Sequence, residues 1–368
     1  MVQEPIFIVD IGSSSVKAGY SGEDTPSYIF PSISSIDYPK YTESIEQYNE
    51  LTHPVHRGQI KDWDQMEQLW TNLSENVGAA TGDISILLIE SQRSTHLDRQ
   101  KWAEMLFDKF RYPSICICNS AALSVFASGR TTGLAVECGA GITSTVPVFE
   151  GLMLSHAAIS MEYGGQDISA NLKKRFLDRR IKIDMESTKT VKERLAYANH
   201  HCNSSRDGEQ STTFSLPDGT DVTVENSILS SCTDPLFINS SISSGGLIGQ
   251  TYESIALCDD SVKSDLANNI IISGGTSMLP GLGDRLNDDL IAKIATEAEY
   301  GRCSISSNLV RVIPHTKHSE RGYTSQRKHA AWTGGSIFSS FGTYHKHLKI
   351  TKQEWEENPD AMLSIKSL

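Results

Sequence analysis

Two segments of the sequence each carry a carboxylate and a run of small residues between two apolar stretches. The first has Asp10, then Gly12–Ser15, then Lys17, and the second has Glu137 followed by Gly139–Gly141. A tight turn of small residues leaves backbone N–H groups open to bind phosphate. A carboxylate just before such a turn can hold Mg²⁺ or its water shell. Two hairpins of this kind in one chain predict a polyphosphate site to which both contribute.

A third glycine turn follows the apolar run Ile270–Ile272 and contains Gly274, Gly275 and Thr276. Glycine at such a turn lets the backbone approach a flat base or a ribose. Taken alone, the segment is equally compatible with a strand-to-helix turn that binds nothing. None of the three turns is a Walker A loop or a Gly-x-Gly-x-x-Gly fingerprint, so a P-loop enzyme and a dinucleotide dehydrogenase are excluded.

These turns need strands and helices to position them. Apolar residues recur at helical spacing in four segments. The residues concerned are Met66, Leu69, Trp70 and Leu73; Trp102, Leu106 and Phe110; Ile168, Leu172 and Phe176; and Leu286, Leu290 and Ile294. Strands that alternate with such helices indicate an α/β fold. Asp218-Gly219 predicts a β-hairpin over 212–224, and the polar stretch 316–326 predicts a loop.

The composition limits the class of protein. The chain has 368 residues, is 38% hydrophobic and carries a formal charge of -12, which suits two domains with substantial cores. The acidic balance and the lack of a visible basic stripe argue against direct nucleic-acid binding. No apolar run reaches the roughly 20 residues that span a bilayer, and Met1–Pro5 does not begin a signal peptide. We therefore expect an intracellular protein without a membrane segment, and the seven cysteines suit reduced thiols.

Nearly the whole chain resembles the actin family. The most specific stretches are Asp10–Ser13 with Val16–Gly19, Ala127–Gly133, Ser273–Thr276, Trp332–Ile337 and Ile350–Trp355. Sugar kinases and heat-shock chaperones share the duplicated hairpins, but no sugar-binding constellation can be placed here. The resemblance implies a duplicated ribonuclease-H-like α/β fold with two lobes around a nucleotide cleft. The small lobe would comprise 1–127 plus 330–368, and the large lobe 128–329 with an inserted subdomain at about 164–242.

The resemblance also implies ATP or ADP with Mg²⁺ or Ca²⁺ in that cleft. Its phosphate contacts would be Gly12, Ser13, Ser14, Ser15, Lys17, Gly139, Ala140 and Gly141. Its adenosine contacts would be Lys192, Glu193, Gly274, Gly275, Thr276, Met278 and Lys328. Asp10 and Glu137 would hold the metal through water. Considered without the resemblance, Lys192 and Glu193 would be interpreted as a pair of solvated charged residues on a helix.

Departures from the family pattern bear on catalysis. Glu137 stands where the family usually has an aspartate, and Ala140 replaces an acidic residue. Ser120 and Ser144 align with the glutamine and histidine that help to position the attacking water. Because hydrolysis of a γ-phosphate depends on positioning and charge stabilisation, we expect nucleotide binding with slow hydrolysis and assign no catalytic residue.

Two further features concern assembly. The family's filament-contact subdomain is shortened here, at 32–53, so self-polymerisation is not expected. A basal hydrophobic groove is implied, which could receive an amphipathic partner helix. Its lining would be Phe126, Leu152, Phe338, Phe341 and Tyr344. The alternative for these residues is that they fill the core.

The resulting expectation is a nucleotide-holding structural subunit of a multiprotein complex. A chromatin remodelling assembly in the nucleus is favoured over a cytoplasmic one, and another actin-family subunit could be a partner. The alternative is a cytoskeletal protein, either a dynactin-type subunit or an ATP-hydrolysing filament former.

Overall fold

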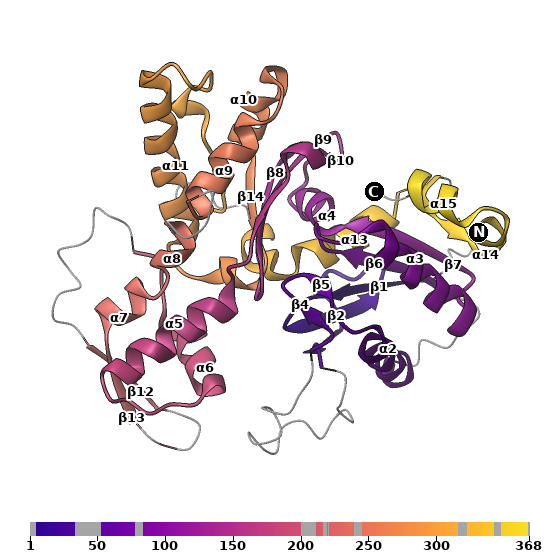
Figure 1. The fold of residues 1–368 in the computed structure, drawn as a ribbon, viewed down its shortest axis with the longest axis horizontal. Helices are drawn as coiled ribbons and strands as arrows, with labels where there is room; N and C mark the ends of the chain where they lie inside the picture. The colour runs from indigo at the N-terminus through magenta and orange to yellow at the C-terminus, as the bar shows by residue number, and fades with distance from the viewer. Residues whose placement is uncertain are drawn as a thin grey trace. The chain divides into compact units, whose positions relative to one another are not determined.

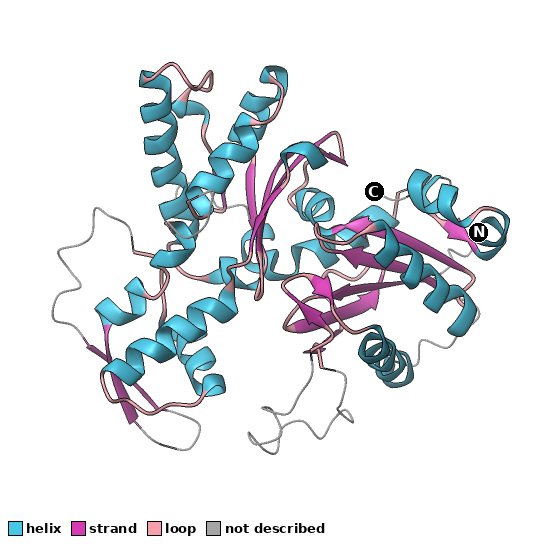
Figure 2. Ribbon diagram, in the orientation of Figure 1, coloured by secondary structure: helices cyan, strands magenta, loops and turns pink. Residues whose placement is uncertain are grey.

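The computed structural model describes residues 5–33, 53–77, 84–199, 211–215, 219, 221–238, 245–315, 322–341 and 347–366 (Figure 1). It divides into two compact units. Unit 1 comprises Met1–Thr131, Val148–Met153 and His329–Leu368. Unit 2 comprises Thr132–Pro147 and Leu154–Lys328. Both units combine a mixed β-sheet with helices (Figure 2).

The sheet of unit 1 has six strands in the order β16-β7-β6-β1-β2-β3. Their bounds are β1 Ile6–Ile11, β2 Ser15–Tyr20, β3 Tyr28–Pro31, β6 Ser85–Glu90, β7 Ser114–Asn119 and β16 Ile350–Thr351. Strands β1 and β2 form an antiparallel hairpin, whereas β1, β6 and β7 run parallel. A small hairpin is formed by β4 Val55–His56 and β5 Gln59–Ile60. The helices are α2 Trp63–Val77, α3 His96–Glu104, which continues into the π-helical turn η2 Met105–Lys109, α4 Ser120–Ala127, α13 Ala330–Ser339, α14 Lys352–Glu357 and α15 Pro359–Ile365.

Alternate residues of β1 pack on opposite faces of this sheet, as the two-residue period of a strand requires. Phe7 and Val9 belong to the core that α2 and α3 cover. Ile6 and Ile8 belong to the core that α4 and α13 cover. Helices α4 and α13 approach closely at Gly334, where a Cβ would lie only 1.8 Å from the Leu123 carbonyl oxygen.

The sheet of the second half of the molecule has the order β10-β9-β8-β14-β15, with β11 paired to β9. The bounds are β8 Gly133–Cys138, β9 Thr143–Phe149, β10 Leu152–Met153, β11 Ile159–Met161, β14 Ile270–Ser273 and β15 Val312–Ile313. A separate hairpin is formed by β12 Ser211–Ser215 and β13 Asp221–Glu225. The helices are α5 Gly165–Asp178, α6 Met185–Leu195, α7 Asn226–Ser231, α8 Asp234–Phe237, α9 Leu247–Ala256, α10 Asp260–Asn268, α11 Leu282–Glu299 and α12 Tyr323–Gln326. Short 3₁₀ turns are η3 Ser155–Ala157, η5 Gly275–Met278, η6 Ser307–Leu309 and η7 Arg327–His329.

Most of the predicted elements are confirmed. The apolar residues of all four predicted helices are buried, and β12 and β13 form the predicted hairpin. Residues 316–321 of the predicted loop lie outside the described residues, and the last part of that prediction is wrong, since Tyr323–Gln326 is helical. The aromatic ring explains the difference: Tyr323 is buried and its hydroxyl donates to the Ile272 carbonyl oxygen at 2.9 Å.

Among the described residues, no helix combines the length and the apolar character needed to cross a membrane.

Candidate functional site

The first phosphate-turn candidate is a two-residue hairpin loop. The Gly12 N–H donates to the Ser15 carbonyl oxygen at 3.0 Å, which leaves Ser13 and Ser14 as the loop. Asp10 and Lys17 are register partners on β1 and β2. The Lys17 Nζ donates to Asp10 Oδ2 at 2.8 Å, and each side chain is only about one-sixth exposed. The turn therefore has a fixed cation and a carboxylate at its base.

Neighbouring segments of unit 1 hold this turn in place. The Gly58 N–H, in the β4–β5 turn, donates to Ser13 Oγ at 3.2 Å. The Ser32 hydroxyl donates to the Gly12 carbonyl oxygen at 2.6 Å. Neither Gly58 nor Ser32 was predicted as part of the site. Arg57 and Gly58 both have positive φ, as a type I′ turn requires, but a turn at these residues does not indicate what it contacts.

The second hairpin repeats the geometry of the first. The Gly139 N–H donates to the Ile142 carbonyl oxygen at 3.0 Å, so Ala140 and Gly141 form the loop. Counting back from this closure, Glu137 corresponds to Asp10 and Ser144 corresponds to Lys17. Ser144 is buried and Glu137 is half-buried. The second hairpin thus keeps the carboxylate but has no lysine at the matching position.

The start of α5 fixes the second turn. The Gly165 and Gln166 N–H groups donate to the carbonyl oxygens of Gly139 and Ala140 at 3.0 and 2.8 Å. A Cβ on Gly164 would lie 2.6 Å from the Ala140 oxygen, so only glycine fits there. Sequence reasoning missed this contact, although the Gly164-Gly165 pair before a helix could have indicated a close approach of the backbone.

Part of the predicted adenosine wall lies against the second turn. The Thr276 hydroxyl donates to the Gly139 carbonyl oxygen at 2.8 Å. The Lys192 Nζ donates to the Gly165 carbonyl oxygen at 2.9 Å, and burial lowers the pKa of this lysine. Gly274 has φ of +87°, and a Cβ there would lie 2.5 Å from the Cys138 oxygen. These contacts bring Thr276, Lys192 and Gly274 together.

The other predicted wall residues are at the surface. Gly275 faces open space, since a Cβ at this position would have nothing within 4 Å. Glu193, Met278 and Lys328 are exposed. Ser120 is half-buried at the first position of α4, after Asn119, whose Oδ1 accepts from the Ala121 N–H at 2.9 Å and caps the helix. The adenosine contacts of these exposed side chains and the water-positioning role of the Ser120 position stay predictions.

Asp10, in unit 1, and Glu137, in unit 2, are the predicted metal residues, and both assignments stay predictions. In the described ranges, no group of three or more His, Cys, Asp and Glu side chains could hold a metal. A metal held through water and phosphate oxygens, as is usual for Mg²⁺, would not need such a group. The small loop residues and the half-buried Lys17 fit a phosphate chain.

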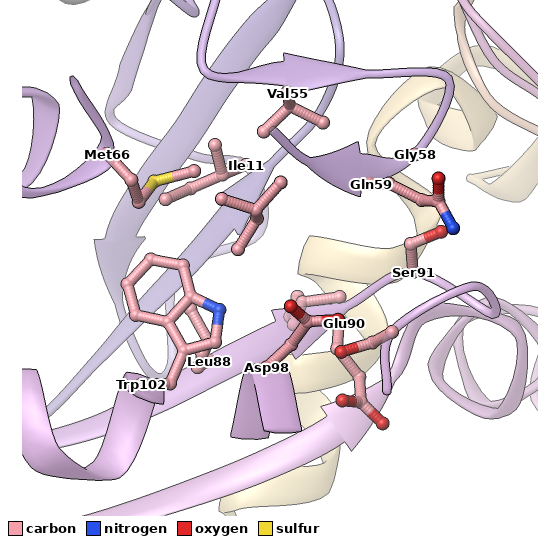
Figure 3. Close-up of a pocket in the computed structure, with 13 residues that line it drawn as sticks. Ile11, Val55, Gly58, Gln59, Met66, Leu88, Glu90, Ser91, Asp98 and Trp102 are labelled. Atoms are coloured by element: carbon pink, nitrogen blue, oxygen red, sulfur yellow. The ribbon is translucent and has the colours of Figure 1, made fainter. Parts of the chain in front are cut away.

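A cavity in unit 1 is lined by Ile11, at the end of β1, and by Gly58 of the β4–β5 turn (Figure 3). Ile11, Met66, Leu88 and Trp102 form its apolar wall. Polar residues at its edge are Gln59, Glu90, Ser91, Ser94 and Asp98. The Glu90 carboxylate is held by Arg99 Nε, at 3.0 and 2.9 Å from its two oxygens. The sequence analysis did not predict this cavity.

The predicted groove residues form an aromatic cluster in unit 1. Phe126 and Phe338 stack with centroids 5.6 Å apart, and Phe341 meets Phe338 edge-on at 6.5 Å. Phe338 is buried, whereas Phe341 is 48% and Leu152 63% exposed. The alternative of core packing therefore holds for Phe338, while Phe341 and Leu152 reach the surface. Tyr344 and most of the segment 32–53 lie outside the described residues.

A family model described as Actin matches residues 2–194 and 184–366, so both units are covered. The duplicated α/β fold predicted from the sequence is confirmed by this match and by the two sheet-containing units.

Proposed function

Because the chain belongs to the actin family, we propose that it is a divergent actin-related protein that holds a nucleotide, hydrolyses it slowly and serves as a structural subunit of a multiprotein complex. The observation that carries this proposal is the inequality of the two hairpins. The first has both Asp10 and Lys17, whereas the second has Glu137 in place of the family's aspartate and Ser144 in place of its histidine.

Binding rests on the chain's own residues at each turn. Lys17 offers a charge-assisted hydrogen bond to a phosphate oxygen, and the small-residue loops 13–14 and 140–141 would lie along the phosphates. A bound Mg²⁺ or Ca²⁺ would neutralise phosphate charge. Asp10 and Glu137 would hold its water molecules. Lys192, Gly274 and Thr276 support the adenosine end, since they pack around the second turn.

Slow hydrolysis follows from the side chains that would position water. Ser120 and Ser144 are shorter than the glutamine and histidine of the family pattern and do not reach as far toward an attacking water. The extra methylene of Glu137, relative to aspartate, displaces its carboxylate by roughly 1–1.5 Å. Misplacement on this scale affects the reaction more than the binding.

A nucleotide that is bound but seldom cleaved acts as a brace, because a ligand that binds only the folded state stabilises it. Phe341, which packs on Phe338, and Leu152 are exposed apolar residues that would contact an amphipathic partner helix. We place the protein in a nuclear chromatin remodelling assembly in preference to a dynactin-type complex, because the filament-contact segment 32–53 is short. The same shortening disfavours self-polymerisation.

Mass spectrometry of nucleotide released from the purified protein tests the proposal, together with an assay of phosphate release. We expect a stoichiometric adenine nucleotide and little free phosphate. Protein that carries no nucleotide would contradict the proposal. Rapid phosphate release with pelleting in high-speed centrifugation would establish the second candidate, a filament-forming ATPase, which the intact Asp10–Lys17 pair favours.

A further inference from the structure

The end of α5 and the segment after it carry a dense cluster of positive charge. Between Lys173 and Lys182, six of ten residues are Lys or Arg and one is acidic, in a chain whose formal charge is -12. Because the chain is acidic overall, we expected no basic stripe. This segment contradicts that expectation. A local reversal of sign against the charge of the whole molecule indicates an interaction surface.

The helix period places this charge on the outside of unit 2. Ile168, Leu172 and Phe176 form the buried face of α5. Lys174 and Leu177 are exposed, one helical turn apart. Beyond the helix, Arg180 has φ of +61°, and it and Lys182 are exposed. Figure 1 shows α5 beside α6 and the β12–β13 hairpin.

Internal contacts account for two of the six basic residues. Arg175 donates to Asn171 Oδ1 at 3.3 Å and to the Ser231 carbonyl oxygen at 3.2 Å. Arg179 forms an ion pair with Glu225. Both also complement the negative end of the helix dipole. The remaining residues, which are Lys173, Lys174, Arg180 and Lys182, form no ion pair within the described part of the chain.

An exposed apolar residue lies within the cluster. Leu177 is 54% exposed, and Lys173 and Lys174 precede it by one helical turn. Met185, at the start of α6, is 39% exposed. Exposed leucine and methionine gain nothing from a phosphate backbone, and the cluster has no aromatic side chain on which a base could stack. A polypeptide with both acidic and apolar side chains would satisfy both features.

We propose that Lys173, Lys174, Arg180 and Lys182, together with Leu177, form a docking surface for an acidic, leucine-containing segment of a partner protein. We call this surface the α5 basic surface. Its residues belong to unit 2, whereas the aromatic cluster of Phe126, Phe338 and Phe341 belongs to unit 1, and the proposal does not depend on nucleotide binding. The basic side chains supply electrostatic attraction, and Leu177 supplies an apolar contact. Because different residues make these two contributions to binding, each can be measured separately.

The test uses the full chain and a short fluorescent peptide in which glutamates alternate with leucines, with binding followed by fluorescence anisotropy. The double variant Lys174→Glu/Arg180→Glu should weaken binding roughly tenfold or more, since two favourable charge contacts become repulsive. Leu177→Ser should weaken it roughly threefold to tenfold through lost apolar burial. Lys61→Glu reverses an exposed lysine of unit 1 and should have no effect.

Three control probes make the proposal falsifiable. In the first control peptide, serine replaces leucine. The affinity of wild-type protein for this peptide should be as low as the affinity of the Leu177→Ser variant for the original peptide. Equal binding of polyglutamate would show that charge alone acts, and tighter binding of a single-stranded oligonucleotide would show a nucleic-acid surface. Self-association that the double variant abolishes would point to a second copy of this chain. Each of these last three outcomes would overturn the proposal, and circular dichroism confirms that the variants are folded.

Discussion

Lys17 and Asp10 face each other across the first hairpin, with Nζ 2.8 Å from Oδ2 and both side chains largely buried. The corresponding residues of the second hairpin are Ser144 and Glu137. The first hairpin therefore pairs its carboxylate with a lysine across the two strands, and the matching position of the second hairpin is a serine.

Replacing Lys17 with methionine should weaken nucleotide binding. The change removes the Lys17 ammonium from the first turn and, with it, the hydrogen bond that this group donates to the Asp10 carboxylate. A hydrogen bond to a charged group contributes about 1.5–3 kcal/mol, so we expect affinity for Mg-ATP to fall roughly 10- to 100-fold. Isothermal titration calorimetry measures this. Lys61→Met, at an exposed lysine, is the matched control, and unchanged affinity in Lys17→Met would refute the assignment.

Restoring the family's side chains should raise turnover. In the triple variant Glu137→Asp, Ser120→Gln and Ser144→His, the water-positioning groups and the shorter carboxylate are returned. Positioned general acid–base groups contribute roughly 10²- to 10⁴-fold in other enzymes, and even the low end would be easy to detect. A continuous phosphate-release assay measures it. The proposal of impaired hydrolysis fails if the single and triple variants all turn over at the wild-type rate while still binding ATP.

Gly334→Ala should destabilise unit 1. The added methyl group would lie 1.8 Å from the Leu123 carbonyl oxygen, so α4 and α13 would have to separate. Overpacking of this kind costs about 1–3 kcal/mol or more in the free energy of unfolding. Urea denaturation of nucleotide-free protein measures the change. Gly275→Ala is the control, because nothing lies within 4 Å of the new Cβ, and equal loss in both variants would contradict the packing argument.

Alkaline pH should destabilise the fold partly through Cys138. Burial raises the pKa of this thiol from 9.0 to about 12. As pH rises, the thiol loses its proton in the unfolded chain before it does so in the folded chain. Its contribution to the free energy of unfolding is therefore fully present below pH 9 and falls as pH rises toward 12, by up to about 1.4 kcal/mol per pH unit. Burial also raises the pKa of Cys232, so this thiol lowers stability at alkaline pH in the same way. The pKa of Lys192 is lowered instead, so below its ordinary value of 10.5 this lysine makes stability increase as pH rises.

The variant Cys138→Ala isolates the thiol. Between pH 9 and about 10.5 its unfolding free energy should fall less steeply than that of wild type. Ala135→Gly, at a buried residue of the same strand, should lower stability without changing the slope. Identical slopes in wild type and Cys138→Ala would rule out a contribution from this thiol.

Local pattern determined much of the fold from the sequence. Leucine and aromatic residues at helical spacing predicted the buried faces of α2, α3, α5 and α11. Small residues between apolar stretches predicted both phosphate hairpins, and each does close through one backbone hydrogen bond around a two-residue loop. These features depend on residues within a turn or two of each other, so chain geometry alone fixes which side chains share a face.

The sequence did not predict which distant segments hold the turns. Gly58 bonds to Ser13 across 45 residues, and Thr276 bonds to Gly139 across 137 residues. The exposed Leu177 among lysines was also overlooked, because overall charge averages away a local reversal. Hydrophobic periodicity indicates which face of a helix or strand is buried, but it does not indicate which other element packs against that face. The partner of each face is set by packing among sequence-distant elements, and only the tertiary structure decides that.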